Sequence, residues 1–258
     1  MPELPEVETV TNSVKKHIIN ESFDSMTVIW PKTLHNFSNP DFEKKIQGKN
    51  IINVFRRAKY IIIQFEKNLM AIHLRMTGKL YVVDNFDRNK KHISLYHQYN
   101  DKYLIYEDTR KFGRFYMYEN MDILNNKLGV EPLSDIFSKK WLIENMKLKK
   151  RQIKSLLFDQ SFICGLGNIY IDESLWRAKI HPLALSNKIS KAKIIDLHSS
   201  IVKVLSDSIK LGGSTIRDYT YDFAYVGNYA LNLKVFGKQG ENRSFHNPLR
   251  CLFEYSLL

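Results

Sequence analysis

The sequence predicts an α+β protein of two domains followed by a short C-terminal segment, and three observations support this. Apolar residues at helical spacing open the chain, an alternation with period two runs from about 26 to 118, and helical spacing returns after 138. A length of 258 residues favours two domains, and a hydrophobic fraction of 44% is enough for packed cores. We therefore expect an N-terminal helix with an antiparallel β-sandwich, then a helical domain and a terminal hairpin.

The first predicted helix covers residues 5–19. Its apolar face is formed by Val7, Val10, Val14 and Ile18. Pro5 suits the first position of a helix, and the neighbouring acidic residues complement the helix dipole.

Short segments that alternate between apolar and polar residues predict the strands. Breaks typical of turns separate them at 66–68, 76–78 and 99–101, so we expect antiparallel hairpins arranged as a sandwich. The predicted strands are Met26–Trp30, Ile51–Arg56, Tyr60–Glu66, Leu69–Arg75, Lys79–Val83, His92–Tyr99, Lys102–Tyr106 and Arg114–Tyr118.

A linker and a set of helices follow. Residues 119–137 contain an Asn-Asn pair, Gly129 and Pro132, which are typical of a connection between domains. Ser138 and Ser190 stand where helix caps are expected, and Gly212-Gly213 ends the last helix. The predicted helices cover 139–149, 153–159, 170–179 and 191–211, and the alternation from 229 onward predicts a hairpin.

Composition narrows the class of protein. The formal charge is +12 and the pI is about 9.5, which favours a polyanionic partner such as nucleic acid. No run of about 18 apolar residues, lipidation signal or charged-then-apolar leader is present, so we expect an intracellular protein away from membranes. The two cysteines, Cys164 and Cys251, make neither a disulfide framework nor a pair with metal-ligand spacing.

The first eight residues, MPELPEVE, are the most informative segment of the chain. Removal of Met1 exposes Pro2 as a secondary amine, and an α-amino group with a pKa of about 8 is partly unprotonated at neutral pH. Such an amine can attack carbon and form an iminium, with the carboxylates of Glu3 and Glu6 nearby in sequence. The alternative is structural: Pro5 starts a helix and the acidic residues complement its dipole.

A glycine turn and a basic stretch form a second candidate site. Gly165-Leu166-Gly167-Asn168 lies between two predicted helices, where backbone N–H groups and a helix N-terminus can hold a phosphate. Basic residues at 147–154, Lys154 among them, precede it and suit a phosphate backbone, although they also suit a solvated helix face. Lys59 could contact phosphate or a developing negative charge, or simply protect a strand edge.

Two predicted hairpin turns carry apolar side chains beside cations. Met76 lies in one turn, and Arg110 and Phe112 lie in the other. This pattern suits a wedge that replaces an extruded base in a duplex. The alternative is that Met76 and Phe112 cap the core.

Taken together, these features resemble the formamidopyrimidine-DNA glycosylase family, the bacterial 8-oxoguanine glycosylases and lyases. The N-terminal motif is specific, because the related endonuclease VIII branch usually has glycine where this chain has Leu4. The matching segments run in the family's order: MPELPEVET at 1–9, RRAKY at 56–60, HLRMTGKL at 73–80, YEDTRKFGRF at 106–115, LGVEPLS at 128–134, GLGNIYIDESLWRAKIHP at 165–182 and LGGSTIRDY at 211–219.

The resemblance implies a role for each matching residue. Pro2 resembles the nucleophile that attacks C1′ of the damaged nucleotide, Glu3 the acid/base, and Lys59 a lysine that contacts phosphate near the lesion. The void left by the extruded base is filled by residues that match Met76, Arg110 and Phe112.

The resemblance also implies a helix–two-turns–helix phosphate site, which matches Asn168 with the Gly167 turn and Lys154 beside it. Residues 213–227 correspond to the loop that closes over the flipped base. Its candidate lesion contacts are Ser214, Thr215, Arg217 and Tyr219. Because this loop is rich in tyrosine here, the way it recognises the base stays open.

The implied function is excision of 8-oxoguanine and formamidopyrimidines from double-stranded DNA, followed by β,δ-elimination. A monomer in the bacterial cytoplasm, associated with the nucleoid, is implied. The implied domains are a catalytic β-sandwich at 2–130, a helix–two-turns–helix domain at 131–228 and a finger hairpin at 229–258.

The C-terminal end departs from the family, which normally has a zinc finger with two CxxC pairs. Here Arg243 and His246 stand where the first pair is expected, and Cys251 has no partner cysteine. A structural zinc site takes four ligands, so we expect no zinc and no other cofactor. The tail is either a shortened hairpin in which Arg243 or Arg250 contacts phosphate, or a truncated end with weaker DNA binding.

Three functions therefore stay open. The first is a bifunctional glycosylase and lyase for oxidised purines. The second is a relative with the preference of endonuclease VIII for oxidised pyrimidines. The third is a catalytically silent protein that binds nucleic acid, although the intact Pro2, Glu3 and Lys59 argue against it.

Overall fold

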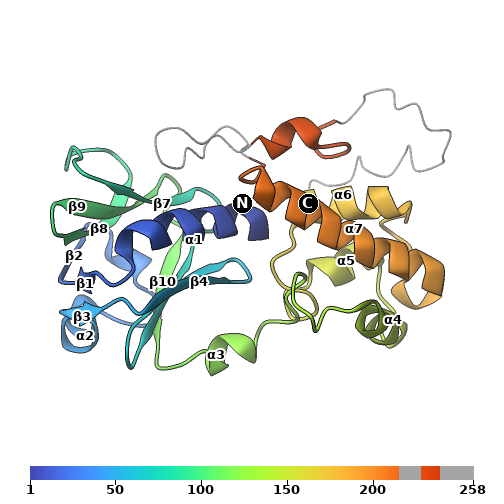
Figure 1. Cartoon of the computed structure of the whole chain (residues 1–258), viewed down its shortest axis with the longest axis horizontal. Helices are drawn as coiled ribbons and strands as arrows, with labels where there is room; N and C mark the ends of the chain where they lie inside the picture. The colour runs from blue at the N-terminus through green and yellow to red at the C-terminus, as the bar shows by residue number, and fades with distance from the viewer. Residues whose placement is uncertain (215–227, 239–258) are drawn as a thin grey trace. The chain divides into compact units, whose positions relative to one another are not determined.

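The period-two segment of the chain folds into two antiparallel sheets of four strands each (Figure 1). The computed structural model describes residues 1–214 and 228–238. The strands of the sandwich are β2 (Ser25–Val28), β4 (Asn53–Arg57), β5 (Tyr60–Gln64), β6 (Leu69–His73), β7 (Gly78–Val83), β8 (Ile93–Tyr99), β9 (Lys102–Asp108) and β10 (Arg114–Tyr118). One sheet has the order β10-β6-β5-β4 and the other β2-β8-β9-β7, so the predicted β-sandwich is confirmed.

Strand register places the apolar residues on the inner faces of the sheets. Phe115 of β10 pairs with Ile72 of β6, and Ile72 pairs with Ile61 of β5. All three side chains are buried in one core cluster. Full burial of each contributes about 1.5–3 kcal/mol, so this row holds the sheet in its register.

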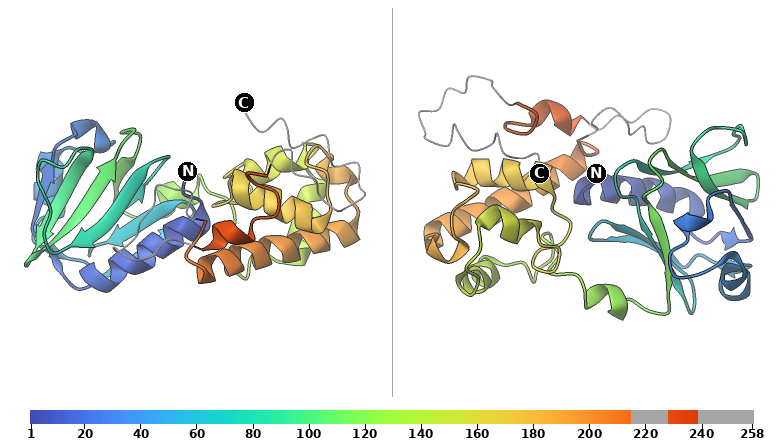
Figure 2. Two further views of the ribbon diagram at one scale, coloured as in Figure 1. Left: turned by 90° about the horizontal axis from the view of Figure 1, so that it is seen from above. Right: turned by 180° about the vertical axis from the view of Figure 1, so that it is seen from behind.

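The N-terminal helix α1 (Leu4–Ile18) covers the edges of the sandwich. It contacts β4 and β5 of one sheet and β7 of the other, and Figure 2 (left) shows it lying along the strands. The predicted apolar face, with Val7, Val10 and Val14 on it, is buried. At the edge strand, the Arg56 guanidinium lies 2.5 Å from the Glu8 carboxylate, which fixes the helix to β4.

Several elements of this region are not predicted from the sequence, because they are too short to show a periodic pattern of apolar residues. Two-residue strands β1 (Ser22–Phe23) and β3 (Lys49–Asn50) pair with each other. Helix α2 (Asn39–Lys45) starts at a capping box formed by Ser38 and Asp41. A 3-10 turn η1 (Pro31–Thr33) and helix α3 (Asp122–Asn125), within the predicted linker, complete the set.

The second half of the described chain is helical, as expected. Its helices are α4 (Lys139–Lys147), α5 (Ile153–Phe158), α6 (Asn168–Ala178) and α7 (Lys191–Lys210), with 3-10 turns η2 (Ser186–Lys188) and η4 (Tyr229–Asn232). The Ser138 side chain accepts a hydrogen bond from the Trp141 backbone N–H at 3.1 Å, so the predicted cap of α4 is confirmed.

The chain divides into two compact units. The first consists of Met1–Lys127 with the described residues of Ile209–Asn228, and the second of Leu128–Ser208 with the described residues from Tyr229 onward. The start of the segment that follows α7 therefore belongs with the sandwich.

The predicted hairpin from 229 is wrong within the described residues. Tyr229–Asn232 forms a 3-10 turn, and the buried Tyr229 ring lies 6.1 Å from the ring of Tyr170. The next backbone N–H groups, those of 234–236, all donate to one carboxylate, that of Glu173. Successive strand N–H groups point in opposite directions, so this arrangement excludes a strand there. Arg243, His246, Arg250 and Cys251 lie outside the described residues.

Candidate active site and nucleic-acid interface

The N-terminus is held by a capping box at the start of α1. The Glu3 backbone N–H donates to Glu6 Oε2 at 2.9 Å, and Glu3 in turn caps the first turn of the helix. Pro2, Glu3 and Glu6 are buried, whereas the Met1 side chain is 42% exposed. The predicted nucleophile thus directly precedes a buried acidic residue that the capping box holds at the start of the helix.

The second oxygen of Glu6 binds Ser214, the second residue of the predicted lesion loop. Glu6 Oε1 accepts from the Ser214 backbone N–H at 2.8 Å and from its hydroxyl at 3.1 Å. Gly213 has a φ of +87°, and a Cβ there would lie 2.9 Å from Glu6 Oε1, so glycine is required at this close approach. Thr215, Arg217 and Tyr219 lie outside the described residues.

Lys59 lies in the tight turn between β4 and β5. Ala58, before it, has a φ of +53°, and its carbonyl accepts from the Arg56 guanidinium at 3.1 Å. Although it carries an ammonium group, Lys59 is only 4% exposed. The turn between β4 and β5 thus holds Lys59 in a buried position instead of leaving it in solvent.

His73 is a neighbour of Lys59 that sequence analysis did not single out. Burial, reinforced by the charges of Arg75 and Lys59, lowers the pKa of His73 to about 3. The Arg75 backbone N–H donates to Nδ1 of this neutral ring at 3.0 Å, which leaves the proton on Nε2. His73 lies in the HLRM segment that resembles the family, but the sequence does not show that this histidine is buried beside two cations.

The two predicted wedge turns present exposed apolar side chains. Met76 is 42% and Phe112 is 48% exposed, so neither caps the core. The Arg110 guanidinium lies 4.7 Å from the centre of the Phe112 ring, a distance typical of cation–π contact. Lys111, between them, has a φ of +57° and places its ammonium 4.0 Å from the centre of the Trp30 ring.

The second unit contains the predicted phosphate site. Gly167 is the N-cap of α6 and the exposed Asn168 is its first residue. Gln160 fixes the glycine turn, because its side chain accepts from the Gly165 N–H and donates to the Leu166 carbonyl, both at 2.9 Å. The positive end of the α6 dipole and the exposed Asn168 thus lie together at the glycine turn, the arrangement in which helix N-termini bind anions.

Lys154 is paired within the protein. Its ammonium lies 2.8 Å and 3.0 Å from the two oxygens of Asp172, whose side chain is 4% exposed. Burial raises the pKa of Asp172, and Lys154 opposes that shift. Because the Lys154 side chain is still 24% exposed, it can share its ammonium with a phosphate.

Glu173 is another residue that sequence analysis did not single out. It is 3% exposed, and its carboxylate accepts from the backbone N–H groups of Lys234, Val235 and Phe236 at 2.8–3.0 Å. The sequence indicates the importance of Glu173 only through its position among the apolar residues of a predicted helix. Its partners, about sixty positions away, become visible only in the fold.

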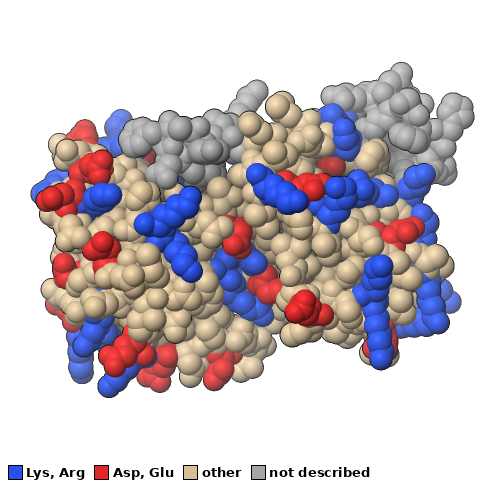
Figure 3. Space-filling view, viewed as in Figure 1, with Lys and Arg blue, Asp and Glu red and all other residues tan. Residues whose placement is uncertain are grey.

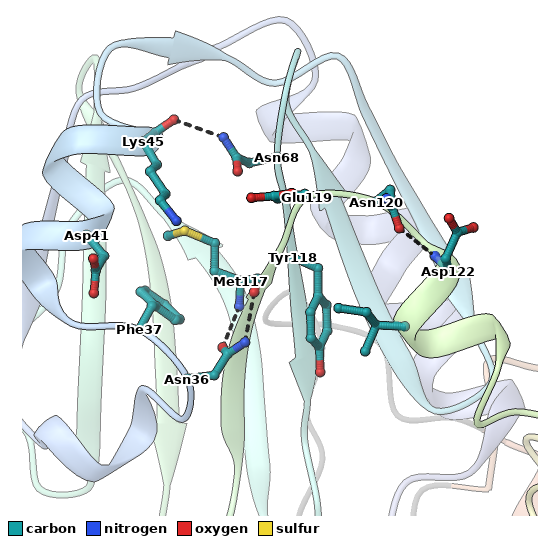
Figure 4. Close-up of a pocket in the computed structure, with 11 residues that line it drawn as sticks. Asn36, Phe37, Asp41, Lys45, Asn68, Met117, Tyr118, Glu119, Asn120 and Asp122 are labelled. Carbon is teal, nitrogen blue, oxygen red and sulfur yellow. Dashed lines mark hydrogen bonds between the residues drawn. The ribbon is translucent and has the colours of Figure 1, made fainter.

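A surface pocket of about 440 Å³ lies elsewhere in the first unit (Figure 4). Asn36, on its wall, makes two 2.8 Å hydrogen bonds with the backbone of Met117. The pocket contains none of the predicted site residues, so we do not assign it to the candidate site.

The net charge of +12 favours a polyanionic partner. Basic side chains, with acidic ones among them, lie over both units on the face in Figure 3.

Among the described residues, no cluster of three or more His, Cys, Asp or Glu side chains has the arrangement of a metal site. No helix in the described part of the chain is long and apolar enough to cross a membrane.

Comparison with known proteins places the chain in a family. The model of the formamidopyrimidine-DNA glycosylase N-terminal domain matches residues 1–115, and the model of the formamidopyrimidine-DNA glycosylase H2TH domain matches residues 128–220. The chain belongs to the formamidopyrimidine-DNA glycosylase family. A formamidopyrimidine-DNA glycosylase of Streptococcus agalactiae is 39% identical over 246 residues, 93% of this chain and 90% of the relative. Another, from Lactobacillus helveticus, is 38% identical over 247 residues, 93% of this chain and 89% of the relative.

Solved structures of the family have the same fold. MutM in complex with DNA containing carbocyclic 8-oxo-G has a TM-score of 0.86 and 37% identity, over 94% of this chain and 91% of that chain. A Lactococcus lactis Fpg variant in complex with Fapy-dG DNA has a TM-score of 0.87 and 37% identity, with the same coverage. The predicted family and the α+β fold are therefore confirmed.

Proposed function

We propose that this protein is a base-excision DNA glycosylase and AP lyase that removes oxidised purines from double-stranded DNA. The observation that carries the proposal is the start of α1, where the buried Pro2 directly precedes Glu3 and the capping box joins the buried Glu3 and Glu6. A protein that only binds DNA has no chemical need for this arrangement. The relatives named above are glycosylases, and the solved ones contain DNA with 8-oxo-G or Fapy-dG.

Pro2 is the proposed nucleophile. After removal of Met1, its secondary amine has a pKa of about 8 and is partly unprotonated at neutral pH. The amine attacks C1′ of the damaged nucleotide and loses its proton, and the bond from C1′ to the base breaks as the base leaves. The bond from C1′ to the ring oxygen then breaks as that oxygen is protonated, and an iminium forms. Proline at position 2 is small enough for the initiator methionine to be removed.

Glu3 is the proposed acid/base. Its carboxyl protonates the ring oxygen of the sugar and then moves protons during β- and δ-elimination, which releases the phosphates on both sides and leaves a one-nucleotide gap. The hydrogen bond from its backbone to Glu6 supports this role, because it fixes the residue next to Pro2.

The remaining site residues are proposed to hold the DNA. Lys59, Lys154 and Asn168, with the Gly167 turn, bind phosphates. The void of the extruded base is filled by Met76, Arg110 and Phe112. The loop that contains Ser214 covers the lesion, and Thr215, Arg217 and Tyr219 follow in this loop.

We also propose that the chain works without zinc, as a monomer in the cytoplasm at the nucleoid. Of its two cysteines, Cys164 is buried and donates to the Val130 carbonyl at 3.4 Å. Only Cys251 remains for the tail, which falls short of the four ligands of a structural site. These residues do not fit a zinc finger.

The test is cleavage of duplexes with one 8-oxoguanine opposite cytosine. We expect strand cleavage that leaves phosphates on both sides of the gap, and we expect it to persist after dialysis against EDTA. Glu3→Gln should slow cleavage at least about 100-fold, the range typical of general acid–base catalysis. Product ends are identified by electrophoresis and mass spectrometry.

A thymine glycol duplex serves as the comparison. Faster cleavage of thymine glycol than of 8-oxoguanine would indicate a preference for oxidised pyrimidines instead. Tight binding of both duplexes without cleavage of either would indicate a silent DNA-binding protein. Loss of activity on treatment with EDTA would contradict the proposal that zinc is not needed.

A further inference from the structure

Asp108, a carboxylate that none of the proposed steps uses, lies between the two wedge turns. It is the last residue of β9, it is 0% exposed, and it pairs in register with Gly78 of β7. Burying a carboxylate is costly unless donors surround it, so its partners indicate what it does.

The donors to Asp108 come from both turns. Oδ1 accepts from the Thr77 hydroxyl at 2.5 Å and from the Arg110 backbone N–H at 3.1 Å. Oδ2 accepts from the Gly113 backbone N–H at 2.8 Å and from the Tyr106 hydroxyl at 3.3 Å. One carboxylate therefore binds the residue after Met76 and the residues on both sides of the 111–112 segment.

Thr77 closes the network by a second route. Its hydroxyl oxygen accepts from the Arg110 N–H at 3.1 Å while its proton goes to Asp108. The two turns also approach closely, because a Cβ at Gly78 or Gly113 would lie 2.3 Å or 1.5 Å from the Tyr106 hydroxyl oxygen. The backbones of both turns thus pack against the buried Tyr106, and both turns donate hydrogen bonds to the buried Asp108.

The geometry of this network contrasts with the exposure of the side chains that it supports. Met76, Arg110 and Phe112 are exposed and contribute little to the core, whereas the Asp108 carboxylate that fixes their turns is buried. Each hairpin can close its own turn without a shared acid. A shared acid couples them.

We propose that Asp108 and Thr77 lock the Met76 turn and the Arg110–Phe112 turn into one rigid wedge, so that all three side chains enter the duplex together. This inference rests on the proposed function. Asp108 and Thr77 are positioning residues: they act through the wedge and touch neither the lesion nor Pro2.

The test is a double-variant cycle on single-turnover excision from the 8-oxoguanine duplex. Met76→Ala and Phe112→Ala are measured alone and together, first in the unmodified protein and then in the Thr77→Val protein. If the turns act as one wedge, the effect of the double variant departs about fivefold or more from the product of the single effects. In the Thr77→Val protein the two effects should multiply to within about twofold.

Single variants at the lock give a second readout. Thr77→Val should slow excision about tenfold, the range for a lost hydrogen bond to a charged group, whereas Thr77→Ser, which keeps the hydroxyl, should stay within about twofold. The matched control is Tyr81→Phe, which removes a 2.9 Å hydroxyl-to-carboxylate bond to Glu107 on the same pair of strands. Its excision rate should not change.

A single-stranded abasic oligonucleotide separates the two proposals. It has no void for a wedge to fill, so borohydride trapping on it should be equal in the unmodified protein, Thr77→Val, Thr77→Ser and Tyr81→Phe. Equal trapping combined with multiplicative Met76 and Phe112 effects in the unmodified protein would overturn the lock but leave the glycosylase intact. If no protein in the set is trapped, the proposed function fails. If Thr77→Val lowers trapping and the midpoint of thermal unfolding together, its role is general stability and the lock is refuted.

Discussion

Five acidic side chains are buried in the described residues, and four of them are joined to parts of the proposed site. Glu3 and Glu6 fix the N-terminus, Asp108 joins the wedge turns, Asp172 holds Lys154, and Glu173 binds the segment after η4. Their donors are mainly backbone N–H groups and hydroxyls, so these acids serve as hydrogen-bond acceptors that fix the backbone.

At the scale of residues, the sequence predicts which side chains take part in the chemistry but not which residues those side chains contact. Pro2, Glu3 and the wedge residues can be identified from the motifs that contain them. Their partners cannot, because Glu6 and Ser214 are 208 positions apart and Lys154 and Asp172 are 18 apart. Hydrogen bonds over such separations depend on the completed fold.

The buried His73 makes stability depend on pH. Its pKa is about 3 in the folded protein and about 6.5 in the unfolded chain, so acid favours the unfolded state. The stabilisation is complete above about pH 6.5 and is lost as the pH falls toward 3. Between pH 7 and 5, we expect the free energy of unfolding to fall by roughly 2 kcal/mol more in the unmodified protein than in His73→Gln.

Urea denaturation at the two pH values measures this difference. His97→Gln serves as a positive control. Burial lowers the pKa of His97 to about 4, so its replacement should reduce the pH dependence of unfolding by a similar amount. Identical pH dependence of the unmodified protein and His73→Gln would show that His73 is not buried as a neutral ring.

At the scale of elements, length decides what the sequence can predict. Helices such as α1 and α7 show several repeats of one apolar face, and their positions are predicted within a few residues. The pair β1 and β3, with two residues each, shows none. The alternation from 229 was misleading because Glu173 collects three successive N–H groups, which overrides the local pattern.

The pair of Lys154 on α5 and Asp172 on α6 joins the two helices beside the phosphate site. Lys154→Met should destabilise the protein by about 1–3 kcal/mol, because it leaves Asp172 buried without its cation. It should also reduce the salt dependence of DNA binding by about one unit of slope, as expected for one lost phosphate contact.

The double variant Lys154→Met/Asp172→Asn separates the two effects. Removing both charges should restore stability, measured by thermal unfolding, while the salt slope stays reduced. A normal salt slope in the stable double variant would show that Lys154 serves only to join the helices and does not bind phosphate.

At the scale of the whole molecule, two units contribute different parts of one proposed activity. The sandwich carries Pro2, Lys59 and the wedge, and the helical unit carries the α6 phosphate site. Composition and periodicity predict the β-sandwich and the helical region, and the family comparison confirms the α+β fold. The compact units show what periodicity does not: residues 211–214, which follow α7, belong with the sandwich, where Ser214 binds Glu6.

The central claim is that the Pro2 amine forms the covalent bond to DNA. The measurement is borohydride trapping on the 8-oxoguanine duplex, followed by digestion and mass spectrometry of the cross-linked peptide. We predict one adduct, on the peptide that begins with Pro2, and its loss when an added residue blocks that amine. A cross-link at a lysine such as Lys59, or trapping that persists when Pro2 is blocked, would contradict the account.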